Sequence, residues 1–178
     1  VAPSGRETML NRCLALVLAA VILGGCVLQS RTPLYSDAEA MLALGETGGM
    51  VRMSSWKDGK WEPDAELAAI AVTGKHYEAT AKSSTIALTF VPLSGSWFVL
   101  QAVEADKPAV YMLAEAKGGA ANVRPLSCRD LRKDDRLHAW IDHDGDDCFI
   151  KPGAPAQELF TNLLRSPGEP TSRLEFIR

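Results

Sequence analysis

Thr85-Ile86-Ala87-Leu88-Thr89-Phe90-Val91 is the stretch that decides the fold of this 178-residue chain. Small or polar residues alternate with Ile86, Leu88 and Phe90. Side chains two positions apart lie on the same face of an extended strand. We therefore expect a β-strand over these residues, with its three large apolar side chains facing a core.

Similar short runs, rich in β-branched and aromatic residues, lie on both sides of this strand. Turn residues separate them at the spacing typical of antiparallel sheets, as in Lys57-Asp58-Gly59-Lys60 and Lys117-Gly118-Gly119. The sequence therefore predicts a mostly β fold: a twisted antiparallel sheet that is sandwich-like or closes partly into a barrel. The expected strands cover residues 50–54, 67–72, 76–81, 85–91, 97–103, 109–115, 121–125, 137–142, 148–151 and 173–177.

Two helices are expected beside the sheet. Residues 155–165 carry apolar side chains at helical spacing, with Pro155 suited to the first turn and Pro167 past the end. A short N-terminal helix is predicted over residues 36–44. There Ser36 would cap the helix and Glu39 would complete a capping box.

The N-terminal part of the chain has a separate, strongly apolar character. Residues 14–23 are uncharged and apolar, Arg12 precedes them, and the run ends in Leu23-Gly24-Gly25-Cys26. Ten residues are about half of the roughly 20 that a membrane-spanning helix needs, and they fit the core of an export signal. Translation would start at Met9, or at Val1 from a non-standard start codon.

Leu23-Gly24-Gly25-Cys26 resembles the lipobox of bacterial lipoproteins, and the chain as a whole resembles small envelope lipoproteins of proteobacteria. The resemblance implies that Cys26 receives a diacylglycerol, that cleavage follows, and that the new amino terminus is acylated. It implies a protein anchored to a membrane and facing the periplasm, with Val27 favouring the outer membrane. The expected organisation is a signal peptide over residues 1–25, a lipidated N-terminus and tether over 26–36, and a single β-rich domain over 37–178.

The resemblance also assigns roles to two of the four cysteines. Cys13 would lie in the signal peptide and Cys26 would carry the lipid, which leaves Cys128 and Cys148. Two thiols in an oxidising compartment predict one disulfide, which on the chain-entropy model stabilises a loop of this size by about 3 kcal/mol. A zinc site or a reactive thiol is the alternative, although the sequence has no Cys-x-x-Cys motif.

The acidic loop near the C-terminus is the cluster closest to a metal-binding motif. Asp142, Asp144 and Asp146 occupy the first, third and fifth positions of an EF-hand calcium loop. The motif fails at its sixth position, Asp147, and at its twelfth, Gly153, where glycine and glutamate are required. We interpret the loop as a polar hairpin turn and keep calcium binding as a hypothesis.

Other candidate site residues have simple structural explanations. His138 and His143 lack the spacing of metal ligands and are expected to be solvated. Trp56 and Trp61 flank a charged turn, where they either pair across strands or line an exposed groove for a glycan or a peptide. No cofactor motif is present. A formal net charge of −3 with scattered basic residues argues against nucleic acid as a partner.

Three classes of function remain open. The preferred one is a non-enzymatic, lipid-anchored envelope protein that binds an envelope protein or glycan partner or supports envelope assembly. The alternative is a ligand-binding or inhibitor module built on a β-barrel, and a further alternative is an envelope hydrolase with a site around residues 142–147. An empty, apolar-lined cavity would favour the second class, convergent His and Asp with shifted pKa values in a cleft the third, and a flat patch the first.

Overall fold

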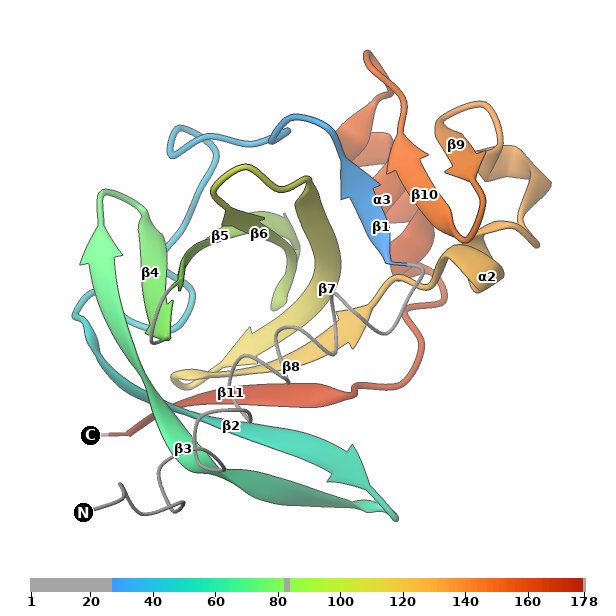
Figure 1. The fold of residues 1–178 in the computed structure, drawn as a ribbon. Helices are drawn as coiled ribbons and strands as arrows, with labels where there is room; N and C mark the ends of the chain where they lie inside the picture. The colour runs from blue at the N-terminus through green and yellow to red at the C-terminus, as the bar shows by residue number, and fades with distance from the viewer. Residues whose placement is uncertain (1–26, 82–83, 178) are drawn as a thin grey trace, which may run out of the picture.

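The structure is a computed structural model that describes residues 27–81 and 84–177. The expected signal peptide and Cys26 lie outside these residues. In the described part of the chain, eight antiparallel strands form a closed barrel (Figure 1). Their bounds are β2 (Gly49–Lys57), β3 (Lys60–Thr73), β4 (His76–Ala81), β5 (Ser84–Ser94), β6 (Trp97–Glu104), β7 (Ala109–Lys117), β8 (Ala120–Pro125) and β11 (Ser172–Ile177).

The barrel is closed by β11, a strand from the C-terminal end of the chain. Strands β2 to β8 follow one another as antiparallel neighbours, and β11 lies between β8 and β2. The expected antiparallel sheet is thus confirmed, and its form is a closed barrel rather than a sandwich. The interior is filled by one apolar cluster, which includes the three side chains of the alternating stretch in β5. Its largest members are Tyr77, Phe90, Phe98, Leu100 and Met112.

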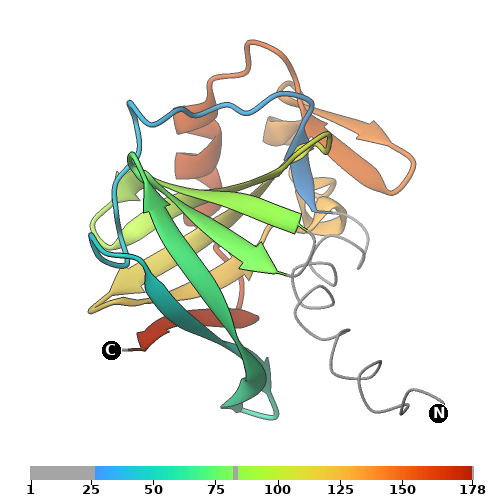
Figure 2. The same ribbon diagram turned by 60° about the vertical axis from the view of Figure 1, so that its left-hand side comes forward.

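The two ends of the barrel differ. At one end lie the β3–β4, β5–β6 and β7–β8 turns, at residues 74–75, 95–96 and 118–119. We call this the strap end, because residues 31–48, the strap, run to it over the outside of the barrel (Figure 2). At the opposite end, β2 and β3 continue past the barrel wall as a hairpin. We call this the hairpin end.

The strap replaces the helix expected over residues 36–44. The structure has turns at residues 37–39 and 43–44. Glu39 accepts the backbone N–H of Ser36, as in a capping box, but the Ser36 hydroxyl donates to the Glu39 carboxylate and does not accept the Glu39 backbone N–H. Tertiary contacts explain the difference. The backbone N–H of Met41 donates to the Phe90 carbonyl of β5, and Leu44 is buried in the interior cluster. An α-helix would use that N–H internally.

Further elements cover the outer face of β5, β6 and β7. They are β1 (Leu28–Ser30), α2 (Cys128–Leu131), the 3-10 helix η1 (Asp135–Leu137), β9 (Ile141–Asp144), β10 (Asp147–Ile150) and α3 (Ala156–Leu164). Strand β1 joins the barrel to this outer layer, because it pairs antiparallel with β7 and parallel with β10. Together they enclose a second apolar cluster, the outer core.

Several predictions from the sequence concern elements of this outer layer. The C-terminal helix is present as α3, and Cys128 and Cys148 are joined by a disulfide. Residues 27–30, expected to lie in a polar tether, instead belong to the fold: Val27 and Leu28 are 7% and 0% exposed. The strand expected over 137–142 is displaced to β9, because Leu137 ends η1 with its side chain in the outer core.

Among the described residues, no helix combines the length and apolar composition needed to cross a bilayer.

Candidate functional site

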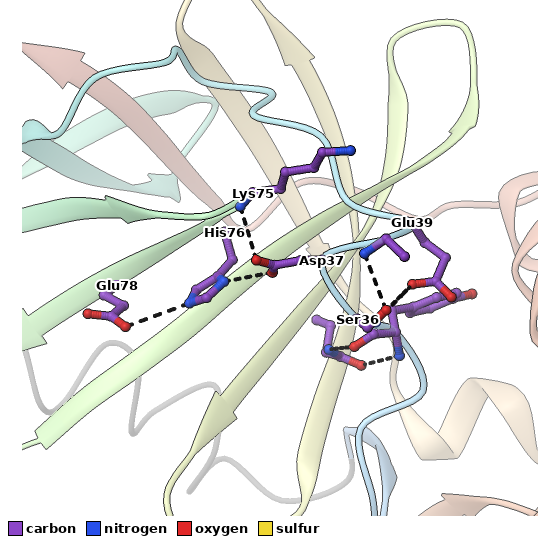
Figure 3. Close-up of polar contacts among 9 residues, drawn as sticks. Ser36, Asp37, Glu39, Lys75, His76 and Glu78 are labelled. Carbon is purple, nitrogen blue, oxygen red and sulfur yellow. Dashed lines mark hydrogen bonds and ion pairs between the residues drawn. The ribbon is translucent and has the colours of Figure 1, made fainter.

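A small cluster of charged side chains fastens the strap to the β3–β4 turn (Figure 3). Asp37 lies between Lys75 and His76: its Oδ2 accepts the backbone N–H of Lys75 at 3.1 Å, and its Oδ1 lies 2.8 Å from Nδ1 of His76. On the other side of the imidazole, Glu78 lies 3.7 Å from Nε2. Gly74 allows this approach, because it has φ +60° and a Cβ there would collide with the Asp37 carboxylate.

The hydrogen bond from His76, followed by that from Lys75, lowers the pKa of Asp37 below its ordinary value of 3.8. A lowered pKa means that the ionised carboxylate stabilises the fold above that value and stops doing so as pH falls through the lowered pKa. We expect Asp37→Asn to reduce stability at pH 7 by less than about 1 kcal/mol, because the side chain is exposed. Urea denaturation at pH 7 and pH 2.5 measures this.

The difference between the variant and the wild type should shrink at pH 2.5. Glu46→Gln, an exposed position on the same strap, is the matched control. An Asp37→Asn deficit that is equally large at both pH values would contradict the assignment of the stabilisation to the carboxylate charge.

The start of the strap is fixed by a buried amide that sequence reasoning missed. Gln101, 2% exposed in β6, accepts the backbone N–H groups of Leu34 and Tyr35 and donates to the Tyr35 carbonyl. Tyr111 donates to the same Gln101 oxygen at 3.1 Å. A buried polar group is stable only when it is paired, so the network fixes the path of the strap. The sequence does contain a signal for this network, because Gln101 is a polar residue within the apolar run of residues 97–103.

The acidic loop forms the hairpin turn that the sequence predicts. Asp144 pairs with Asp147 across the β9–β10 ladder, and Gly145 between them has φ 60°. Asp142 and Asp146 are exposed like the rest of the loop. Among the described residues, no group of three or more His, Cys, Asp or Glu side chains could hold a metal ion. The calcium hypothesis gains no support from this geometry.

The two histidines near this loop lie close to each other on the surface. The rings of His138 and His143 are 6.1 Å apart, and Nε of Arg132 donates to Nδ1 of His143 at 3.2 Å. Desolvation, followed by the charge of Arg132, lowers the pKa of His143. Both side chains are exposed, which agrees with the solvated histidines that the sequence predicts.

Trp56 and Trp61 form a cross-strand pair on the hairpin that projects from the barrel. They are directly opposite in the β2–β3 register, with ring centroids 5.0 Å apart and an interplanar angle of 62°. Trp56 is 40% exposed. Both interpretations from the sequence therefore apply in part: the rings pack on each other, and one of them faces solvent.

A groove of about 480 Å³ lies between α2 and η1 on one side and the C-terminal end of α3 on the other. Its apolar lining includes Leu126, Leu131 and Leu163. Charged side chains rim it as ion pairs, with Lys133 2.9 Å from Asp130 and Arg136 2.6 Å from Asp134.

These features are dispersed over the molecule. The strap cluster lies at one end of the barrel, the tryptophan pair at the other, and the acidic loop in the outer layer, so that the structure does not bring the sequence-predicted residues into one site. No protein-family model, curated protein or solved structure matches the chain.

Proposed function

We propose that this chain is a bacterial envelope lipoprotein whose barrel binds a partner without catalysing a reaction. Cys26 carries the lipid, and the domain faces the periplasm, by preference from the outer membrane. The observation that carries the proposal is the position of Val27. This residue, next to the lipobox-like sequence, is buried and bridges Ser127, so the residue that follows the expected anchor is itself part of the packed domain.

The groove between α2, η1 and the end of α3 is where we expect the partner to bind. Apolar side chains line it, and Asp130 and Asp134 are already neutralised by basic neighbours. A rim of paired charges around an apolar centre suits a protein surface of mixed composition. This supports a protein partner of the envelope more than a free ionic ligand.

A ligand-binding or inhibitor barrel is the second candidate function, because closed eight-stranded barrels can hold a small ligand. In this protein the interior is occupied by its own side chains. Tyr77 is fully buried, and its hydroxyl bonds the strap at Leu44 and Gly45. A ligand inside the barrel would have to displace these groups, which makes an external binding surface the better-supported choice.

The anchoring proposal is tested with the full-length gene expressed in a Gram-negative host. We expect the wild type to incorporate an alkyne-labelled fatty acid and to partition into the detergent phase of Triton X-114. Cys26→Ser should abolish both, because no other residue of the mature chain would take the lipid. Cys13→Ser, inside the expected signal, is the matched control and should behave as the wild type. Membrane association that survives Cys26→Ser would refute the anchor.

Partner binding is tested separately by a photo-crosslinking amino acid placed at Ser166 in the groove. Lys117, the exposed last residue of β7 at the strap end, is the control position. We expect one discrete adduct from Ser166 in intact cells and none from Lys117. The same adducts from both positions would count against the groove as the binding surface.

A further inference from the structure

The β2–β3 hairpin leaves the barrel as an isolated two-stranded ribbon. The ladder between β2 and β11 stops at Ser55, and the last backbone bond on that side joins the Trp56 N–H to the Thr171 carbonyl at 2.9 Å. On the other side, β4 pairs with β3 only from Ala69 onward. Within the described residues, the tip of the hairpin therefore has no neighbouring strand, and its tryptophan pair projects beyond the barrel wall.

The start of the described chain lies at the same end of the barrel. Strands β2 and β8 both run antiparallel to β11, so they run in the same direction and finish at the same end. Val27 bridges Ser127, just after β8 ends at Pro125. In Figure 1 the beginning of β1 and the tip of the β2–β3 hairpin both lie on the right, opposite the C-terminus, with β1 well above the hairpin.

The distance from the anchor to the fold is fixed by covalent geometry. Adjacent Cα atoms are about 3.8 Å apart, so a lipid on Cys26 begins one residue from the buried Val27. A chain with no free tether cannot hold its domain far from the bilayer. If Cys26 is acylated, Val27 and the barrel end at which it lies are held close to the headgroups.

The side chains at the hairpin tip suit such a surface. Tryptophan has an apolar ring with a polar N–H, and it concentrates at membrane–water interfaces. Lys57 and Lys60, with side chains 62% and 70% exposed, flank the pair and have stems long enough to reach out to water. Glu62 lies within 4 Å of both amines and, with Asp58, balances their charge. The tip is therefore amphipathic and close to neutral.

We propose that Trp56 and Trp61 lie in the headgroup region of the bilayer to which Cys26 is anchored, so that the hairpin is a second, non-covalent membrane contact that orients the barrel. This inference rests on the proposed acylation of Cys26. Because the tip carries almost no net charge, the contact is made by the tryptophan rings and needs no anionic lipid.

The test uses the mature, acylated full-length protein in phosphatidylcholine vesicles, with and without bromine on the acyl chains. Bromine quenches tryptophan fluorescence at short range. Two of the four tryptophans lie on the hairpin. We expect clear quenching in the wild type, and we expect Trp56→Phe/Trp61→Phe to lose about half of it or more. Trp140→Phe, which changes a residue of the outer layer, is the control and should retain the quenching.

Phenylalanine preserves most of the ring packing, and a circular dichroism melt confirms that each variant is folded. The mass of the N-terminal peptide from the same sample shows whether Cys26 is acylated, and so distinguishes a failure of the hairpin contact from a failure of the anchor. Acylated Cys26 with equal quenching in the wild type and the double variant would overturn the hairpin contact alone. It would leave the hairpin facing a periplasmic protein or glycan. Cys26 without acyl chains would overturn the anchor and, with it, the orientation.

Discussion

Replacing Phe160 by alanine is expected to lower the free energy of unfolding by about 3–5 kcal/mol. Phe160 lies on α3 and is fully buried in the outer core. Its ring centroid is 5.6 Å from that of Tyr111 on β7 and 6.2 Å from that of Tyr35 on the strap. Truncation removes apolar contact with both and leaves a cavity that rigid barrel strands cannot fill.

Guanidinium chloride denaturation followed by circular dichroism measures this loss. Gln157→Ala, an exposed position on the same helix, is the matched control and should change stability by less than about 0.5 kcal/mol. A Phe160→Ala cost below about 1 kcal/mol would show that α3 is held loosely. A separate early transition in the variant would show that the outer layer unfolds independently of the barrel.

The sequence predicted the barrel strands well because their pattern is local. Alternation in β5 places Ile86, Leu88 and Phe90 on one face, and all three lie in the barrel interior. The period of two depends only on neighbouring residues and on the presence of a buried face. Turn residues such as Gly118 with φ 64° then fix where one strand ends and the next begins.

Closure of the barrel was not predictable in the same way. Strand β11 reaches its place between β8 and β2 from the end of the chain, and no local pattern records which strands it will join. Strand β7 has almost no alternation, since six residues from Ala109 to Ala114 are all buried. Both of its faces are covered, one by the barrel interior and one by the outer core.

The strap shows how tertiary contacts override local propensity. Glu39 accepts the backbone N–H of Ser36, which is half of the expected capping box, but the chain then leaves the helical path. Leu44 is buried in the barrel interior, and the backbone N–H of Met41 donates to β5. Asp37 and His76 are far apart in sequence, so their contact could not be predicted. The contact between Trp56 and Trp61 could be predicted, because the turn between them sets the register of the two strands.

Removal of the disulfide is expected to cost about 3 kcal/mol, because Cys128 and Cys148 close a loop of 20 residues in the unfolded chain. The loop spans α2, η1 and β9, and few of its side chains are buried: Leu131, Leu137 and Ile141. With so few apolar contacts of its own, the segment depends on the cross-link. Amide exchange should therefore accelerate there more than in the barrel strands when the bond is lost.

Cys128→Ala/Cys148→Ala and the reduced wild type should show the same decrease in denaturation midpoint, and the variant should not respond to reductant. On the proposed function, Cys13 is removed with the signal and Cys26 is acylated, so a thiol assay on mature, unreduced, unfolded protein should find no free thiol. Two titratable thiols would mean that the bond is absent in the cell. A single thiol would point instead to an unmodified Cys26, since a disulfide consumes cysteines in pairs. One assay thus tests both the cross-link and the anchor.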